Sequence, residues 1–267
     1  MMLALAGCGG KPAARPHHDG GDAGSGAVVS GAADRDAGAP ARDAVSGGGT
    51  IAVMVQWPDA PAAMRVSPGV TACATARPPR ARIGALHGVG GAVVMIDGAI
   101  AGGRVAAAVP VAPVRVTVRD CALAPRTAVA AAGATLEVQA QDDAGHAITI
   151  AELGPAWSTV APQAGEVVTH ARLPVWGHTV ALPMATAGVR RIGADGADDA
   201  AYVIVTDQPY AAVTADDGSA ALTQVPAGTH TIVAWLAPAA GQPALVARGQ
   251  ATVVAGDRVE LTLRMAP

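Results

Sequence analysis

The fold is decided by the stretch from Val189 to Trp235, which reads VRRIGADGADDAAYVIVTDQPYAAVTADDGSAALTQVPAGTHTIVAW. Its β-branched run, Ala201–Thr206, predicts a strand that ends at the turn residues Asp207-Gln208-Pro209. Further on, Asp217-Gly218 indicates a hairpin turn, and Thr229–Leu236 predicts a closing strand. We therefore expect the stretch to join two β domains, with the boundary after Gln208.

Outside this stretch the chain alternates apolar and polar residues and shows no convincing helical period. In the last segment, for example, Val259, Leu261 and Leu263 share one face. Residues 128–132 are rich in alanine but have no helix caps. The fold class expected is all-β: a sandwich over residues 49–208, then a small sandwich over residues 209–267. The remaining predicted strands are Ile51–Trp57, Ala92–Asp97, Val114–Val118, Ala134–Ala140, His146–Ile150, Val167–Ala171, Thr179–Leu182, Leu245–Ala255 and Arg258–Arg264.

The composition limits both the core and the partners. Of 267 residues, 51% are hydrophobic, but aromatic residues make up only 2% and phenylalanine is absent. The core must therefore be built mainly from valine, isoleucine, leucine and alanine. The net charge is -3 and no basic stripe is present, so nucleic acid is not an expected partner.

The N-terminus predicts export. Leu5-Ala6-Gly7-Cys8 resembles a bacterial lipobox, in which the cysteine is lipidated after cleavage. Residues 1–8 are then a signal remnant, and residues 9–48, a low-complexity stretch, form a flexible tether. The expected location is the cell envelope, lipid-anchored in the periplasm or at the outer membrane. If Cys8 is not processed, the protein is a soluble exported one.

The three cysteines allow one disulfide besides the lipidated Cys8. Cys73 and Cys121 both lie at borders between strands and loops of the first domain, and an oxidising compartment permits their pairing. We therefore predict a disulfide between them. The alternative is two buried free thiols.

Several short motifs resemble one bacterial periplasmic family through their order and spacing. They include the VVMIDG strand, VTVRDCALAP, Ala201-Tyr202-Val203, Asp207-x-Pro209-Tyr210 and Ala234-Trp235. The family is the plastocyanin-like proteins, or cupredoxins, fused to a carboxypeptidase-regulatory-like β domain. Some of its members are known as methylamine-utilisation proteins. The resemblance covers roughly Gly49 to Pro267.

The resemblance also implies that a copper site has been lost. The family places Cys, His and Met, spaced C-x-x-H-x-x-M, just before the Ala-Tyr-Val strand, and an earlier His completes the site. Carried over without gaps, these positions hold Gly193, Gly196 and Asp199, and the earlier His matches His146. Without the thiolate no blue-copper site forms. We expect His146 to be hydrogen-bonded to a turn, and Val189–Asp199 to be a polar surface loop beside it.

Two functions stay open at this point, and neither is enzymatic, because no catalytic constellation is found in the sequence. The first is a non-catalytic exported lipoprotein whose degenerate cupredoxin-like domain binds or scaffolds an unknown envelope protein or ligand, without a cofactor. The second is a metal-handling protein that binds copper or calcium through His146 and the Asp195–Asp199 loop. Clustered carboxylates suit a hard cation, but they are also common in solvated loops.

Overall fold

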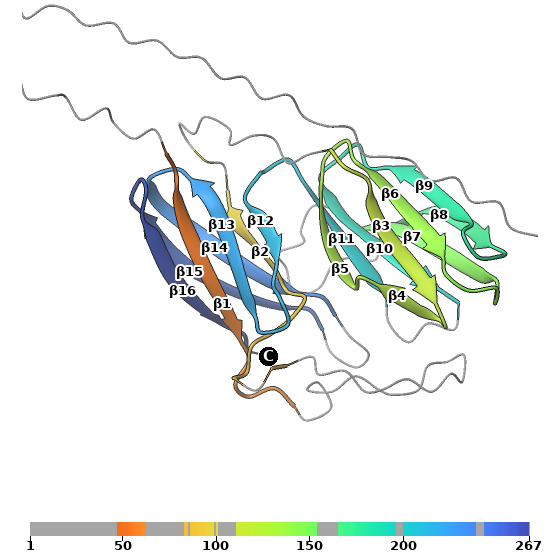
Figure 1. The fold of residues 1–267 in the computed structure, drawn as a ribbon, viewed down its shortest axis with the longest axis horizontal. Coiled ribbons are helices and arrows are strands. Elements are labelled where there is room, and N and C mark those ends of the chain that lie inside the picture. Colours follow the sequence, from red (N-terminus) through yellow and green to blue (C-terminus); the bar gives the residue numbers. More distant parts are fainter. Residues whose placement is uncertain are drawn as a thin grey trace, which may run out of the picture. The chain divides into compact units, whose positions relative to one another are not determined.

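The computed structural model describes residues 47–61, 83–84, 86–98, 100, 111–153, 165–195, 200–238 and 243–266 (Figure 1). These residues form strands β1 to β16 and no helix, so the all-β prediction is confirmed. No helix with the length and apolarity of a membrane span occurs among them. Residues 1–46, with Cys8 and nearly all of the expected tether, lie outside the described part of the chain, as does Cys73.

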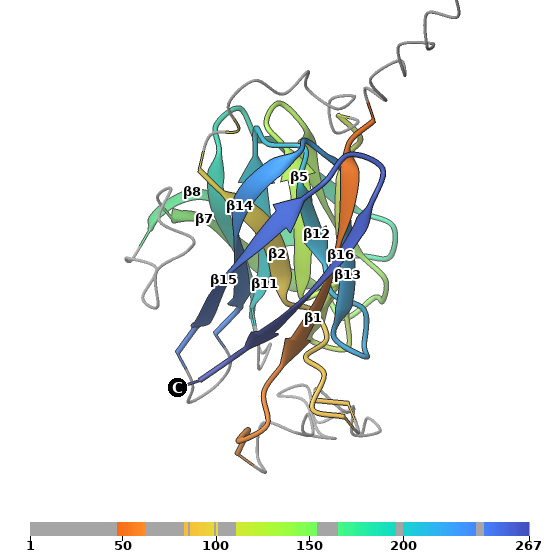
Figure 2. The ribbon, with the colours of Figure 1, turned by 90° about the vertical axis from the view of Figure 1, so that its left-hand side faces the viewer.

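The first sandwich is built from two chain segments that are far apart in the sequence, and we call it the host sandwich. Its sheets have the strand orders β13-β1-β16 and β12-β2-β14-β15. Figure 2 shows β1 between β13 and β16. Its strands are β1 (Gly49–Gln56), β2 (Val93–Asp97), β12 (Ala211–Val213), β13 (Ser219–Val225), β14 (Gly228–Leu236), β15 (Leu245–Val253) and β16 (Arg258–Arg264).

Strand β1 shows why these segments combine. Its residues alternate strictly between buried and half-buried positions, with Ile51, Val53 and Val55 facing the core. As the central strand of its sheet, β1 pairs antiparallel with β13 on one edge and parallel with β16 on the other, so both sets of its backbone groups are bonded. The core that it enters also contains Ile232 and Leu263 from the C-terminal strands.

The second sandwich is continuous in sequence and lies between β2 and β12 along the chain, so we call it the inserted sandwich. Its sheets have the orders β5-β11-β10-β7-β8 and β4-β3-β6-β9. Its core is aliphatic, with Leu136, Ile148 and Ile192 fully buried. Its strands are β3 (Val114–Arg119), β4 (Ala122–Ala124), β5 (Thr127–Ala131), β6 (Thr135–Ala140), β7 (His146–Leu153), β8 (Glu166–Leu173), β9 (Thr179–Pro183), β10 (Gly188–Ala194) and β11 (Ala201–Thr206).

A third apolar cluster joins the two sandwiches. Met95 and Trp235 of the host sandwich pack with Val189, Tyr202 and Ile204 of the inserted one. The rings of Tyr202 and Trp235 meet edge to face, with centroids 5.7 Å apart and planes at 75°. Because β11 faces its own core on one side and this cluster on the other, every residue of β11 is buried.

The strand pairing corrects the expected domain division. Strands β1 and β2 were placed in a first domain of residues 49–208, but they pair with strands of the segment 209–267. The small C-terminal domain is therefore part of a larger, discontinuous sandwich. The division was drawn from turn signals along the chain, and strand periodicity carries no information on which distant strand is the partner.

Candidate functional site

His146 begins β7 and lies beneath the turn that precedes that strand. Its side chain is 1% exposed, and its Nε2 atom lies 2.6 Å from Asp142 Oδ1. The turn forms here because Asp142 Oδ1 also accepts the Ala144 amide at 3.2 Å, and because Gly145 adopts a φ of +68°. Asp142 Oδ2 accepts the Asp120 amide from the β3–β4 turn. His146 is thus held by a hydrogen-bonded network of two turns.

The electrostatics of this network centre on Asp142. Burial raises the pKa of its carboxyl, but hydrogen bonds from the Asp120 amide, His146 and the Ala144 amide outweigh that effect. The net result is a pKa below the ordinary value, so Asp142 is ionised at neutral pH. An ionised carboxylate accepts the hydrogen bonds of its three partners and stabilises the turn.

The segment expected beside His146 does lie along β7. Gly193 is the partner of Thr149 in the β10–β7 pair, and Asp195 exchanges two bonds with Ala147. The Asp195 amide donates to the Ala147 carbonyl at 2.9 Å, and the Ala147 amide donates to Asp195 Oδ1 at 2.8 Å. Residues 196–199, with Gly196 and Asp199, lie outside the described residues.

The prediction of a polar loop over Val189–Asp199 is wrong for its first part. Residues 188–194 form β10, a strand with sheet partners on both sides, and Val189 and Ile192 are fully buried. The acidic cluster and glycines suggested a loop, and Val189-Arg190-Arg191-Ile192 does not alternate with period two, because Val189 faces the cluster between the sandwiches and Ile192 faces the inserted core. A central strand buried on both faces was therefore not predicted.

These positions do not converge as metal ligands. Gly193 offers no side chain, and a Cβ built there would have only distant neighbours, with Arg191 Nη1 at 3.8 Å and Thr149 O at 4.0 Å. His146 Nε2 is already engaged by Asp142, and one oxygen of Asp195 is engaged by the Ala147 amide. Across the residues described, no group of three or more His, Cys, Asp or Glu side chains could hold a metal ion.

Cys121 sits in the tight turn between β3 and β4. Both turn residues have left-handed backbones, with φ of 48° at Asp120 and 56° at Cys121, as a two-residue hairpin requires. Cys121 is buried and is disulfide-bonded. Because Cys73 lies outside the described residues, its pairing with Cys121 stays a prediction.

A buried ion pair at the start of β10 was not foreseen from the sequence. Arg190 is 3% exposed, and its Nη2 donates to Glu152 Oε1 at 2.6 Å and to the Thr186 carbonyl at 3.2 Å. Burial lowers the pKa of the guanidinium, while Glu152 raises it. Arginine nevertheless stays charged. One sequence feature pointed to a buried arginine: Arg190 lies two residues before Ile192 and so shares a face of β10 with this core residue.

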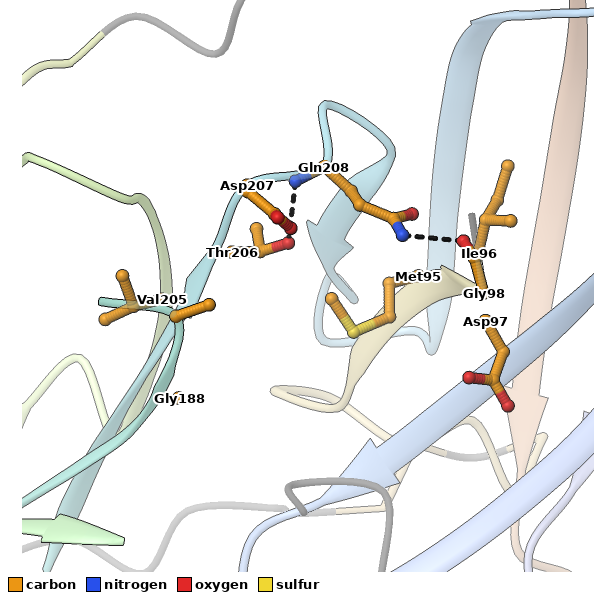
Figure 3. A pocket seen from close by; sticks show the side chains of 10 residues that line it. Met95, Ile96, Asp97, Gly98, Gly188, Val205, Thr206, Asp207 and Gln208 are labelled. Carbon is orange, nitrogen blue, oxygen red and sulfur yellow. Dashed lines mark hydrogen bonds between the residues drawn. The ribbon is translucent and has the colours of Figure 1, made fainter. Parts of the chain in front are cut away.

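One cavity opens where the chain passes between the sandwiches, with a volume of about 170 Å³ (Figure 3). Several of its polar groups form hydrogen bonds within the segments that connect the sandwiches. Gln208 Nε2 donates to the Gly98 carbonyl at 2.6 Å, and the Gln208 amide donates to Thr206 Oγ1 at 3.0 Å. Its lining holds no histidine, cysteine or serine, and its polar side chains are those of Asp97, Thr206, Asp207 and Gln208. The lining residues are Met95, Ile96, Asp97, Gly98, Ala187, Gly188, Val205, Thr206, Asp207 and Gln208.

Comparison with known proteins gives structural similarity only. No family signature and no curated protein sequence matches the chain. Among solved structures, a pseudoazurin from Sinorhizobium meliloti is 16% identical, with a TM-score of 0.26 over 37% of this chain and 76% of its own. Auracyanin B is 11% identical, with a TM-score of 0.26 over 43% of this chain and 98% of its own. At these TM-scores the similarity says nothing about function.

Proposed function

We propose that the protein is a non-catalytic exported lipoprotein. Its inserted sandwich would be a cupredoxin-like module that has lost copper and binds or scaffolds another component of the cell envelope. The observation that carries the proposal is the state of His146. This histidine is buried and bonded to Asp142, no group of metal-ligating side chains gathers around it among the described residues, and Gly193 stands at the thiolate position.

The two-sandwich architecture supports a scaffold role. The inserted sandwich is attached by two chain connections and by the apolar cluster around Trp235. A module held in this way keeps its orientation relative to its neighbour, which suits the presentation of a surface. Catalysis would need a converging set of reactive side chains, and in the described cavity the Gln208 side chain and the Thr206 hydroxyl are already engaged by the Gly98 carbonyl and the Gln208 amide.

The metal-handling alternative is tested by equilibrium dialysis against calcium, followed by elemental analysis of the protein. We expect no stoichiometric calcium, because one carboxylate oxygen of Asp195 already accepts a hydrogen bond from the Ala147 amide. One calcium per chain, lost in an Asp195→Asn variant, would replace the scaffold proposal with the metal-handling one. Asp257→Asn, a change in a distant host-sandwich turn, is the matched control.

Anchoring is tested separately by cell fractionation. Wild-type protein should sediment with membranes and carry lipid at Cys8, and Cys8→Ser should move to the soluble fraction. The same distribution of both proteins between the fractions would rule out lipidation at Cys8 as the anchor, and recovery of both in the soluble fraction would leave the soluble exported protein.

A further inference from the structure

The chain uses aromatic residues sparingly, and it exposes one of them. Four of its six aromatic side chains, those of Trp57, Tyr202, Tyr210 and Trp235, are at most 5% exposed. Trp176 is 62% exposed, and the sixth, Trp157, lies outside the described residues. An indole in water does not contribute to the core of a protein that has so few large side chains. Val175 beside it is 52% exposed, so the two side chains form a small apolar patch on one turn.

The turn that carries Trp176, residues 174–178 between β8 and β9, is firmly built. The Trp176 amide donates to Asp143 Oδ1 at 2.9 Å, and the Gly177 amide donates to the Ala140 carbonyl at 2.9 Å. The His178 amide closes the turn on the Val175 carbonyl at 3.2 Å, with Gly177 at a φ of +78°. Because its backbone is fixed, the turn presents Trp176 without a large ordering cost on binding.

Polar side chains bond to the backbone of the turn next to Trp176. Gln139 Nε2 and the Thr179 hydroxyl both donate to the Gly177 carbonyl, at 3.5 and 3.2 Å. These bonds leave two acceptors, Asp143 Oδ2 and Gln139 Oε1, without a partner among the described residues. The site therefore combines one flat apolar surface with hydrogen-bond acceptors from side chains that contact the same turn.

The size of the apolar surface decides which ligand fits. A stable protein partner buries roughly 800 Å² on each side, with an apolar centre. Here the exposed apolar surface of the turn consists of Val175 and Trp176. A sugar ring matches it better, since a pyranose has an apolar C–H face that packs on an indole and hydroxyl groups that donate to carboxylate and amide oxygens.

We propose that the Trp176 turn binds a neutral oligosaccharide, with one sugar ring packed on the indole and its hydroxyl groups donating to Asp143 and Gln139. The proposal rests on the proposed function, because it names the class of ligand that the binding module takes. It does not depend on copper, on calcium or on the lipid anchor.

To test this, the full-length protein is titrated with chitotetraose, cellotetraose and maltotetraose. Binding is measured by calorimetry and by tryptophan fluorescence. At least one of the three should bind and change the emission of the exposed indole. Trp176→Ala should weaken binding by about tenfold or more, the loss expected for one stacking contact. Asp143→Asn keeps the Oδ1 acceptor of the turn and loses only the charge, so it should weaken binding without unfolding the turn.

Val254→Ala is the matched control, since Val254 is also exposed but lies in the host sandwich. The three variants should melt at the temperature of the wild type. If none of the oligosaccharides binds at millimolar concentration, the sugar-binding proposal is wrong. The scaffold role is tested independently, by the calcium and copper experiments. Binding that Trp176→Ala leaves unchanged would also overturn the sugar-binding proposal and would place the sugar elsewhere.

Discussion

The two sandwiches are built from similar strands but differ in how the chain assembles them. The inserted sandwich takes all of its strands from one continuous run, β3 to β11. The host sandwich needs β1 and β2 from before the insertion and β12 to β16 from after it. The contacts of the host, such as Thr50 with Arg258, therefore close longer loops than those of the insert, such as Thr127 with Tyr202. The inserted unit has all of its sheet partners within its own run, and the host depends on both of its halves.

The largest expected effect comes from separating the two units. A fragment of residues 111–208 with Cys121→Ser, made because the predicted partner Cys73 lies outside it, should fold cooperatively, since all strands of both its sheets are present. A fragment of residues 209–267 should be unfolded, since β13 loses β1 and β14 loses β2. Circular dichroism and thermal melting measure both. Cooperative folding of the second fragment alone would contradict the discontinuous host.

A third chain sharpens this prediction. The Gln208 side chain bonds to the Gly98 carbonyl, so the two ends of the insertion lie next to each other. A short Gly-Ser linker between residues 98 and 208 should therefore restore a folded host without the inserted sandwich. Failure of this chain to fold would mean that the host depends on the apolar contact with the insert.

The contact between the sandwiches is expected to be the next most sensitive feature. Trp235 is 0% exposed and lies in the cluster that joins the two units. Trp235→Ala should cost about 3–5 kcal/mol of unfolding free energy, the usual loss for a buried tryptophan. Trp176→Ala removes the same side chain from an exposed turn and should change stability by less than about 0.5 kcal/mol. If denaturant titrations showed that Trp235→Ala loses no more unfolding free energy than Trp176→Ala, the cluster would contribute no stability.

The ion pair of the inserted sandwich should respond unequally to the loss of each partner. Glu152→Ala leaves the buried Arg190 guanidinium without its carboxylate and should cost about 1–3 kcal/mol, at the lower end because Glu152 is 38% exposed. Arg190→Met removes the buried charge and should be close to neutral. If Arg190→Met is the more damaging change, the pair is a net source of stability.

The smallest expected effect concerns the His146 network and its dependence on pH. The pKa of Asp142 is lower in the folded chain than its ordinary value of 3.8, so its contribution is present above that value and is lost as the pH falls through the folded pKa. Wild-type protein should therefore lose stability on acidification. Asp142→Asn should be about 1 kcal/mol less stable at neutral pH and less sensitive to acid. Parallel acid sensitivity in the two proteins would exclude this role for Asp142.

Most strands of this fold could be predicted from the sequence, because apolar and polar side chains alternate along them. The inward positions Val259, Leu261 and Leu263 are the more buried ones in β16. Ala-rich β5 forms a strand against its helix propensity, because it pairs in parallel with β11. The parallel pairing of β1 with β16 could not be foreseen, since no local pattern encodes a partner some 200 residues away.

The candidate site was predictable in part. The position of His146 at a turn, beside the segment that contains Gly193, follows from residues whose order resembles a known family. That Asp142 engages the histidine was not foreseen, because the bond depends on the conformation of a five-residue turn. Arg190 was missed because strand β10 was interpreted as a loop.

We propose that the His146–Asp142 network stands where the resembled family binds copper, and titration of the full-length protein with Cu(II) tests this most directly. No intense blue band is expected, since copper–thiolate absorption needs a cysteine ligand and Gly193 stands at that position. No shift of the His146 ring signals in NMR spectra is expected with Cu(I), because no group of metal-ligating side chains gathers at His146 among the described residues. An intense blue band, or loss of the Asp142 contact on binding one copper per chain, would contradict it.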